Sequence, residues 1–418
     1  MPHASQTLGM MLTVKMKVLY IYSEFIYTLV FTDNSWCQQD TEWAYHLHPI
    51  DIQPFECLVG PKTLIPDNPL DIFQLFFTDE ILEVIVDASN QYAGSTMHAE
   101  RFSKWAKYTF DDLKACLGFQ ILISINRPPS LVDYWSKNPR PVADRISRDR
   151  FRELQRHLHF VDNSTVIPRG QKGHDRLGKV RPILTYITQK CKEVYSPHKE
   201  VTVDEAMIKF QGRSSLKQYL PMKPTKRGIK VWVLGDANNG YFSNLSVYTG
   251  KEGIKYEEEL CTKVVKNLTT ELRGLHHHAY FDNYFTSLSL IEDLLTDGIY
   301  ACGVARKDRK YFPPQLSEAK LKQRGESLTV QKGGVMACTW MDKKPVMGCC
   351  VTAYGRPGLL RLQLSPISRS ASLSRNSLKG NGQGTFPFDP SFIHRVTVVI
   401  AVGSEQQLDI QYNSCTCQ

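Results

Sequence analysis

The sequence lacks an uninterrupted run of about 18 apolar residues, the length that a membrane-spanning helix requires. The nearest approach, residues 18–31, is interrupted by Glu24 and is not followed by a small-residue cleavage site. We interpret it as a buried strand or an N-terminal extension. The sequence therefore predicts no membrane partner.

The 11 cysteines lack the paired CxxC spacing of a zinc site. Cys349 and Cys350 are adjacent, and Cys415 and Cys417 are separated by one residue. The other thiols, such as Cys116, stand among apolar residues. This pattern favours reduced thiols in an intracellular protein over the disulfide framework of a secreted one.

Acidic residues are scarce in one part of the chain. The whole sequence has 51 Lys and Arg against 42 Asp and Glu, but residues 101–199 have 20 against 9. A basic segment in a near-neutral protein indicates a polyanionic partner, with double-stranded DNA the first candidate. An ordinary solvated basic face is the alternative.

Helical patterns occupy residues 67–200. Thr78 stands at the start of one apolar periodic run, and Thr109 and Asp112 have the spacing of a capping box before another. A third predicted helix starts near residue 148 and presents arginines four residues apart. These arginines are Arg148, Arg152 and Arg156. They could lie along a phosphate backbone, or they could form a solvated helix face.

Beyond residue 201 the pattern changes to strands. The expected order is three strands, a helix, a fourth strand, a helix and a fifth strand, with Asn239-Gly240 as a hairpin turn. This is the order of the ribonuclease H-like α/β fold, whose first and fourth strands are neighbours. Asp204 lies on the first strand and Asp282 at the end of the fourth.

Two aspartates at adjacent strand ends can hold Mg²⁺, which activates a water or a 3′-hydroxyl for phosphodiester chemistry. Each aspartate also has a structural interpretation. Asp204 could be a strand-edge residue, and Asp282 could cap the following helix.

The runs "VTVDEAMIKFQGRSSLKQYLPMKPTKRGIKVWVLGDANNGYFSNLSVYTGK" and "YFDNYFTSLSLIEDLL" closely resemble piggyBac-type transposases and the piggyBac transposable element-derived proteins. The resemblance covers roughly residues 67–354. It implies a helical DNA-binding and dimerisation region ahead of a ribonuclease H-like DDE-type catalytic domain with a β-rich insertion. It also implies a Mg²⁺ cofactor, a homodimer, a nuclear location, and excision and insertion at TTAA sites.

Asp204 and Asp282 match the family's first two catalytic and metal-binding aspartates. Basic residues near the first aspartate are candidates for gripping DNA phosphates, although a basic loop packed on the sheet is the alternative. They are Arg213, Lys223, Lys226, Arg227 and Lys230.

The family's third aspartate has no counterpart. Asp342 lies in a predicted hairpin turn, Asp236 in the Asn-Gly turn, and Asp389 between prolines and aromatics. A truncated or alternatively spliced product is the simplest account. We therefore expect a transposase-derived nuclear DNA-binding protein with impaired catalysis. The alternatives are an active Mg²⁺-dependent transposase that cuts and joins at TTAA sites, and an unstable product.

The expected organisation has five parts. They are an N-terminal extension (1–66), the helical DNA-binding and dimerisation region (67–200), the ribonuclease H-like core (201–304), an incomplete β-rich insertion (305–354) and a low-complexity, disordered tail (355–418).

Overall fold

The fold is seen in a computed structural model. It describes residues 42–97, 105–125, 130–136, 144–210, 212–221, 223, 225–250 and 257–351. The chain divides into two compact units, residues 1–44 and 45–418, and the elements below belong to the second. The predicted tail, from residue 355 onward, lies outside the described residues, as does most of the predicted N-terminal extension.

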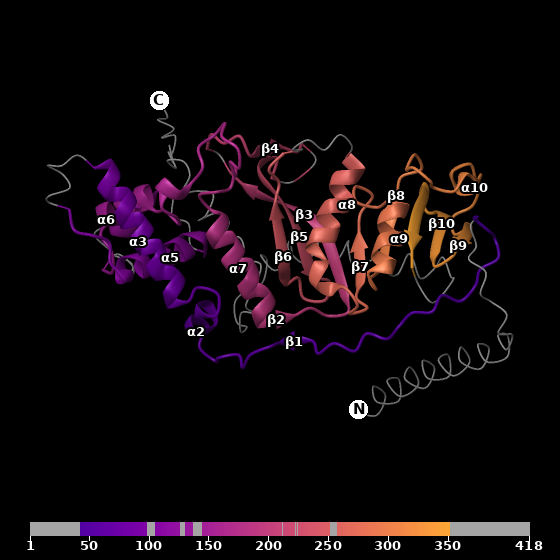
Figure 1. The fold of residues 1–418 in the computed structure, drawn as a ribbon, viewed down its shortest axis with the longest axis horizontal. Helices are drawn as coiled ribbons and strands as arrows, with labels where there is room; N and C mark the ends of the chain where they lie inside the picture. Colours follow the sequence, from indigo (N-terminus) through magenta and orange to yellow (C-terminus); the bar gives the residue numbers. More distant parts are fainter. Residues whose placement is uncertain are drawn as a thin grey trace, which may run out of the picture. The chain divides into compact units, whose positions relative to one another are not determined.

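Between the short strand β1 (Gly60–Pro61) and the large sheet, the chain is mainly helical (Figure 1). Its helices are α2 (Pro69–Gln74), α3 (Asp79–Thr96), α5 (Phe110–Ile125), α6 (Arg148–His157) and α7 (Arg181–Val194), with the short 3₁₀ turns η1 (Leu131–Trp135) and η2 (Asn163–Thr165). The capping box before α5 is confirmed. The Thr109 N–H donates to Asp112 Oδ2 at 2.9 Å, and the Asp112 N–H donates to Thr109 Oγ1 at 3.1 Å.

Thr78 is the N-cap residue of α3 by position, as expected, but its side chain does not cap the helix. Instead, Thr78 Oγ1 lies 2.6 Å from the hydroxyl of Tyr186 on α7. The hydroxyl therefore connects two helices.

Strands form one large mixed sheet and one small pair. The sheet holds β3 (Glu200–Lys209), β4 (Lys217–Tyr219), β5 (Arg227–Asp236), β6 (Phe242–Val247), β7 (His278–Phe281), β8 (Tyr300–Ala305), β9 (Ser327–Lys332), β10 (Val335–Met341) and β11 (Pro345–Cys350); β1 (Gly60–Pro61) pairs with β2 (Tyr195–Ser196).

The centre of the sheet has the expected topology. Strands β3, β5 and β6 are antiparallel neighbours in that order, while β7 pairs parallel to β3 and β8 pairs parallel to β7. The second edge of β5 is shared, because β4 pairs with its first residues and β6 with the rest. The predicted ribonuclease H-like arrangement is confirmed.

The connecting helices are α8 (Glu257–Leu268) and α9 (Leu288–Thr296), followed by the short α10 (Pro314–Ser317). Helix α8 ends at Leu268, and the 3₁₀ turn η3 (Thr270–Leu272) follows. The hydroxyls of Thr269 and Thr270 donate to carbonyls one turn earlier, at 2.9 and 2.8 Å, which weakens helix continuation.

The predicted hairpin near the end of the described chain is confirmed as β10 and β11. Strand β9 was not predicted. Cys350 of β11 pairs with Cys302 of β8, so β11, β10 and β9 continue the main sheet.

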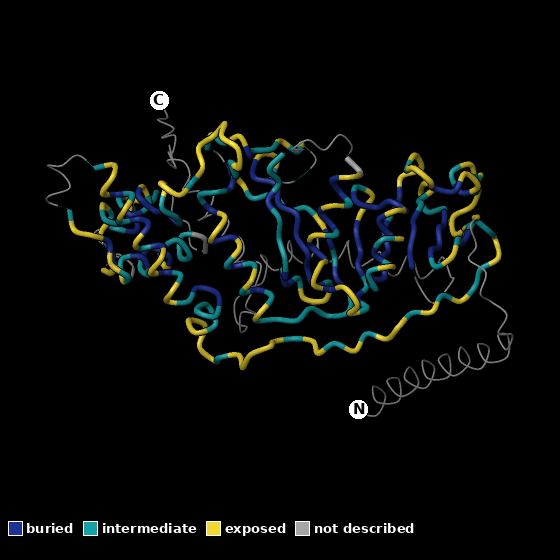
Figure 2. The backbone as a smooth tube through the Cα atoms, in the orientation of Figure 1, coloured by how far each residue is buried: buried dark blue, intermediate teal, exposed yellow. Residues whose placement is uncertain are grey.

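One hydrophobic cluster joins the helices to the sheet. It includes Leu82 of α3, Leu117 of α5, Ile187 of α7 and Val231 of β5. Figure 2 shows β5, β7 and β8 as largely buried, whereas β3 between them is mostly of intermediate burial. Because the sheet packs directly on these helices, its strand ends are held at fixed positions.

An extended segment, residues 45–61, runs along the sheet (Figure 1). The His48 N–H donates to Gln331 Oε1 of β9 at 2.8 Å, and the Gln53 N–H donates to the Tyr300 hydroxyl of β8 at 2.7 Å. The segment ends in β1, where Gly60 pairs with Ser196. No helix in the described part of the chain has both the length and the apolar character to cross a membrane.

Candidate metal and nucleic-acid site

Asp204 and Asp282 lie on neighbouring parallel strands. In the β3–β7 ladder Val203 pairs with Phe281, the last residue of β7, so the next residue along each chain segment is an aspartate. Paired strands are about 4.8 Å apart, so the two aspartates lie side by side where β7 ends. The structure thus places together the two residues that the sequence singles out.

Asp204 has the electrostatics of a ligand position. Its side chain keeps access to solvent, but protein surrounds it on most sides. This partial burial raises the pKa of Asp204, and the negative charges of Asp282 and Glu205 add to the increase, although the Glu205 N–H and the positive charge of Lys223 act against it. Its Oδ1 accepts the Glu205 N–H at 2.7 Å. A nearby cation would relieve the repulsion between the two carboxylates.

Asp282 is fixed by the turn after β7. Its Oδ1 accepts the Tyr284 N–H at 2.9 Å, and its carbonyl oxygen accepts the Thr286 hydroxyl at 2.8 Å. The N-cap of α9 is Ser287, whose hydroxyl accepts the Leu290 N–H. The alternative interpretation of Asp282 as the cap of that helix is therefore wrong.

Glu205 is a third acid beside the pair, which sequence reasoning did not single out. Its Oε2 lies 2.8 Å from Lys230 Nζ, and its Oε1 lies 3.3 Å from Lys223 Nζ. Burial alone would raise the pKa of Glu205, but the two lysines outweigh this and lower it. Glu205 is therefore held as an anion by the protein's own cations.

The described residues contain no group of three or more His, Cys, Asp or Glu side chains arranged to hold a metal ion. Asp236 is 1% exposed and lies 2.7 Å from His198 Nδ1. Asp342 pairs with Arg324 at 2.7 Å, between β10 and β11. Neither joins the aspartate pair, and Asp389 lies outside the described residues.

The predicted arginine stripe lies on α6. Phe151 and Leu154 face the core, while Arg152 and Arg156 are exposed and Arg148 lies 3.3 Å from Asp149. A fourth arginine of this helix is structural. Arg150 pairs with Asp112 at 2.7 Å and donates to the carbonyls of Ala106 and Lys107.

The basic residues after β3 fall into two groups. Arg213, Lys226 and Arg227 are exposed. Lys223 is half-buried, and Lys230 is only 8% exposed, with its Nζ 4.6 Å from the Tyr284 ring centre. The structure therefore does not bring Lys230 to the surface.

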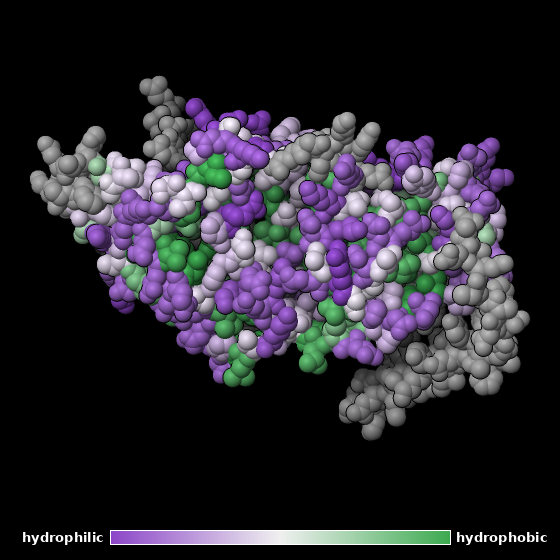
Figure 3. All heavy atoms as spheres, in the orientation of Figure 1, coloured by the Kyte–Doolittle hydropathy of each residue, from purple (hydrophilic) through white to green (hydrophobic). Residues whose placement is uncertain are grey.

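Hydrophilic residues cover much of the visible face, with apolar patches between them (Figure 3). The order of strands and the carboxylate pair, one within β3 and one directly after β7, together define a ribonuclease H-like protein with an acidic site.

Comparisons with known proteins agree with this class. A family model described as Transposase IS4 matches residues 68–370. The chain is 29% identical over 292 residues to human PiggyBac transposable element-derived protein 3, which covers 67% of this chain and 47% of that protein. It is 30% identical over 308 residues to human PiggyBac transposable element-derived protein 2, covering 69% and 49%.

Among solved structures, a cryo-EM structure of the piggyBac transposase synaptic complex with hairpin DNA has a similar fold. The TM-score is 0.67 at 23% identity, with 83% of this chain and 76% of that chain covered. The chain belongs to the piggyBac-type transposase family. It spans about half the length of these two curated relatives.

Proposed function

We propose that this protein is a transposase-derived DNA-binding protein that holds a divalent metal ion weakly and has little or no strand-transfer activity. The observation that carries the proposal is the relation of three acids. Asp204 and Asp282 lie side by side, whereas Glu205 is neutralised by Lys223 and Lys230.

Double-stranded DNA is the proposed partner for two reasons. The exposed Arg152 and Arg156 stand one turn apart on α6, which suits contacts to successive phosphates. The structural relative is a piggyBac transposase in a synaptic complex with hairpin DNA. Arg213 and Lys226 would add phosphate contacts near β4.

Asp204 and Asp282 would hold the metal ion, for which Mg²⁺ is the proposed identity. The residues fit such an ion, because Mg²⁺ uses one or two carboxylates and completes its shell with water. The bound ion would supply Lewis-acid activation of a water or a 3′-hydroxyl. The chain itself positions the Asp282 carboxylate through the Tyr284 N–H.

Impaired catalysis follows from the number of acids. The resemblance to DDE-type transposases implies three catalytic aspartates around the metal, of which Asp204 and Asp282 are two, and loss of a ligand would reduce the stabilisation that the metal supplies. Glu205 is committed to its lysines, and no third carboxylate joins the pair in the described ranges. The second candidate is an active Mg²⁺-dependent transposase that cuts and joins at TTAA sites, for which the adjacent aspartates are the supporting observation.

DNA binding is tested by fluorescence anisotropy with a labelled duplex at several salt concentrations. The affinity should fall steeply with salt, and Arg152→Ala with Arg156→Ala should reduce the slope of log K against log salt by about 1 per arginine. Arg273→Ala is the matched control, because Arg273 pairs with Asp297 at 3.2 Å. A chain that binds no duplex at low salt would overturn the proposal.

Catalysis is tested with labelled duplexes bearing TTAA in the presence of Mg²⁺. We expect no cleavage or strand transfer above that of Asp204→Ala and Asp282→Ala. Robust cleavage that disappears in both variants would instead establish the active transposase.

A nuclear location and a homodimer belong to the same proposal. Fluorescence imaging of the tagged chain tests the first, and light scattering with and without duplex DNA tests the second. A chain excluded from the nucleus, or monomeric under both conditions, would overturn the respective part.

A further inference from the structure

A recess with a volume of about 630 Å³ lies around β4, next to the C-terminal end of β3. The volume falls within the range of small-molecule sites. Its lining residues come from β3, β4, the start of β5 and the turn before it. They are Lys209, Phe210, Lys217, Tyr219, Thr225, Lys226 and Arg227.

The recess carries four cations and no carboxylate. Lys209, Lys226 and Arg227 are exposed, and the described residues provide no acidic partner for them. Lys217 Nζ donates to the Gly212 carbonyl at 2.8 Å, which fixes the side chain and leaves its charge uncompensated. The arrangement contrasts with Lys230, whose charge is balanced by Glu205. Clustered cations of this kind attract a phosphate group.

The recess also carries an exposed aromatic ring. Tyr219 is 58% exposed, and the guanidinium carbon of Arg227 lies 5.1 Å from its ring centre. Phe210 is 7% exposed and forms part of the wall. An aromatic face beside cations is the platform on which proteins stack unpaired bases, because every base has a π-face.

We propose that this recess binds one nucleotide with an unpaired base, the phosphate against Lys226 and its neighbouring cations and the base stacked on Tyr219. The proposal adds a binding site to the proposed DNA-binding function. It rests on that function for the assumption that the nucleotide belongs to DNA. Lys209 follows Asp204 by five residues on β3, about 17 Å along an extended strand. That is the length of about five nucleotides at the axial rise of one DNA strand. A strand lying on the aspartate pair could therefore place an unpaired base in the recess.

Single-stranded DNA and a free nucleotide share this chemistry, and the experiment separates them. Fluorescence anisotropy measures binding of the full chain to a labelled single-stranded thymidine 12-mer and, separately, to the same sequence as a duplex. A third titration adds free dTMP as a competitor of the labelled single strand. Tyr219→Ala should weaken single-strand binding about tenfold, and Tyr219→Phe should restore it, because stacking does not need the hydroxyl. Duplex binding should change less than about twofold in both variants.

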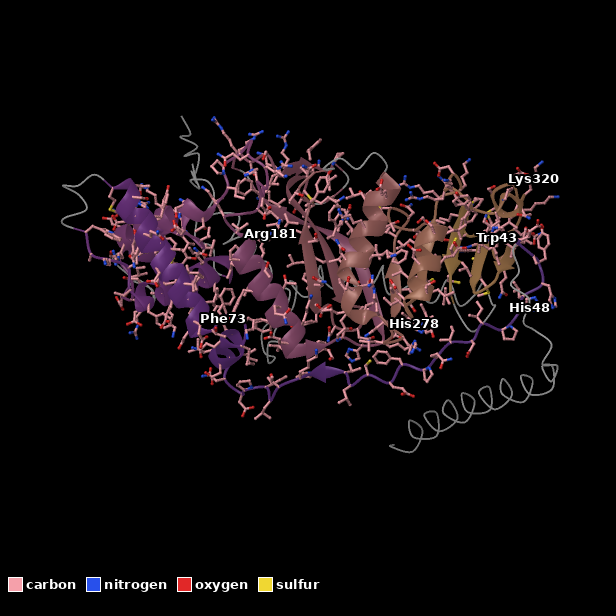
Figure 4. The ribbon with its side chains drawn as sticks, viewed as in Figure 1. Trp43, His48, Phe73, Arg181, His278 and Lys320 are labelled. Atoms are coloured by element: carbon pink, nitrogen blue, oxygen red, sulfur yellow. The ribbon has the colours of Figure 1, made fainter. Side chains whose placement is uncertain are left out.

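Two control variants match the chemistry of the substitutions. Tyr45→Ala removes a similarly exposed tyrosine, 60% exposed, and Lys320→Ala removes a single positive charge beside α10 (Figure 4). Strands β4 and β9 stand at opposite ends of the sheet order, and Lys320 lies between α10 and β9 in the chain. Both controls should bind all three probes as the unsubstituted chain does.

The outcomes decide the proposal separately from DNA binding. An equal loss of duplex and single-strand affinity in Tyr219→Ala, or no loss of either, overturns the nucleotide site. If dTMP competes with the labelled strand in the unsubstituted chain but not in Tyr219→Ala, the recess also binds free nucleotides. If dTMP does not compete in the unsubstituted chain, the recess binds only nucleotides that are part of a strand. If the unsubstituted chain fails to bind duplex, the proposed function fails while the single-strand titration still decides the recess.

Discussion

Lys230 Nζ lies 2.8 Å from Glu205 Oε2, one residue along β3 from Asp204. The ammonium group also lies within 6 Å of three ring centres, those of Trp232, Tyr248 and Tyr284. Tyr284 follows Asp282 by two residues, and its N–H fixes the Asp282 carboxylate. The Glu205–Lys230 ion pair therefore supports Tyr284, the residue whose N–H holds the Asp282 carboxylate.

Glu205→Gln should destabilise the fold by about 1–3 kcal/mol in urea unfolding. The substitution leaves Lys230 buried without a counter-charge, although the partial exposure of Glu205 reduces the cost below that of a fully buried pair. Glu200→Gln at the start of β3 is the matched control. The double variant with Lys230→Met should cost less than the sum of the single variants. An additive cycle would show that the pair does not act together.

Asp204→Asn should raise the melting temperature in the presence of EDTA. The raised pKa means that ionised Asp204 destabilises the folded state. This destabilisation is fully present above the folded pKa, and therefore at neutral pH. The uncharged asparagine side chain removes it. The access of Asp204 to solvent keeps the gain to roughly 1–3 °C. Calorimetry with Asp308→Asn as the control checks this.

Addition of Mg²⁺ should raise the melting temperature of the unsubstituted chain more than that of Asp204→Asn, which is the reverse of the difference expected in EDTA. A metal ion bound to the folded state stabilises it by mass action, so the unsubstituted chain should gain melting temperature and Asp204→Asn should gain less. Equal gains in both would place any bound Mg²⁺ away from Asp204.

Much of the core could be predicted from the sequence. The alternating runs of β3, β5 and β6, with the Asn239-Gly240 turn, determine three antiparallel neighbours, and the helical runs between later strands determine parallel crossovers. That order alone places Asp204 beside Asp282. The division into domains stays a prediction.

Other features depend on contacts that no local pattern records. Glu205 meets Lys230 only because the ladder pairs Met207 with Lys230, which is a matter of register between strands. The segment 45–61 has no helical or strand periodicity, and it is held by single hydrogen bonds such as His48 N–H to Gln331. Strand β9 forms against β10, and its short mixed pattern gives no distinct signal.

Acidification should destabilise the fold between pH 6.5 and about 4. Burial lowers the pKa of His278 to about 4 and also lowers that of His277. A histidine with a depressed folded pKa contributes stability above its unfolded pKa of 6.5 and loses it as the pH falls. His278 is the first residue of β7, an inner strand of the sheet, and Figure 4 shows it at the lower end of the strands.

Urea unfolding at pH 7.5 and 5.0 checks this expectation. Each of the two histidines contributes at most about 1.4 kcal/mol per pH unit within its window, and His278 contributes less because its side chain keeps some access to solvent. His278→Gln should reduce the difference between the two pH values, whereas His174→Gln, in an exposed loop hydrogen bond to Ile167, should not. A pH difference unchanged in His278→Gln would contradict the assignment.

Two glycines should respond to alanine with opposite signs. Gly303 of β8 stands against the turn after β7, where an added Cβ would overlap Thr286 Oγ1 and lie 2.8 Å from the Phe281 carbonyl oxygen. Gly118 lies inside α5, where an added Cβ would meet no atom within 4 Å. Gly303→Ala should therefore destabilise the fold by about 1–3 kcal/mol. Gly118→Ala should stabilise it by about 0.5–1 kcal/mol, because alanine loses less backbone entropy in a helix.

Urea unfolding of both variants measures the two effects, and metal binding distinguishes their causes. The Gly303 contact lies next to the Thr286 hydroxyl, which donates to the Asp282 carbonyl at 2.8 Å. Displacement of Thr286 should move the Asp282 carboxylate away from Asp204, so Gly303→Ala should also weaken Mg²⁺ binding. Gly118→Ala should leave Mg²⁺ binding unchanged, because α5 does not contribute to the aspartate site. If Gly303→Ala binds Mg²⁺ as the unsubstituted chain does, the turn after β7 does not position the ligand.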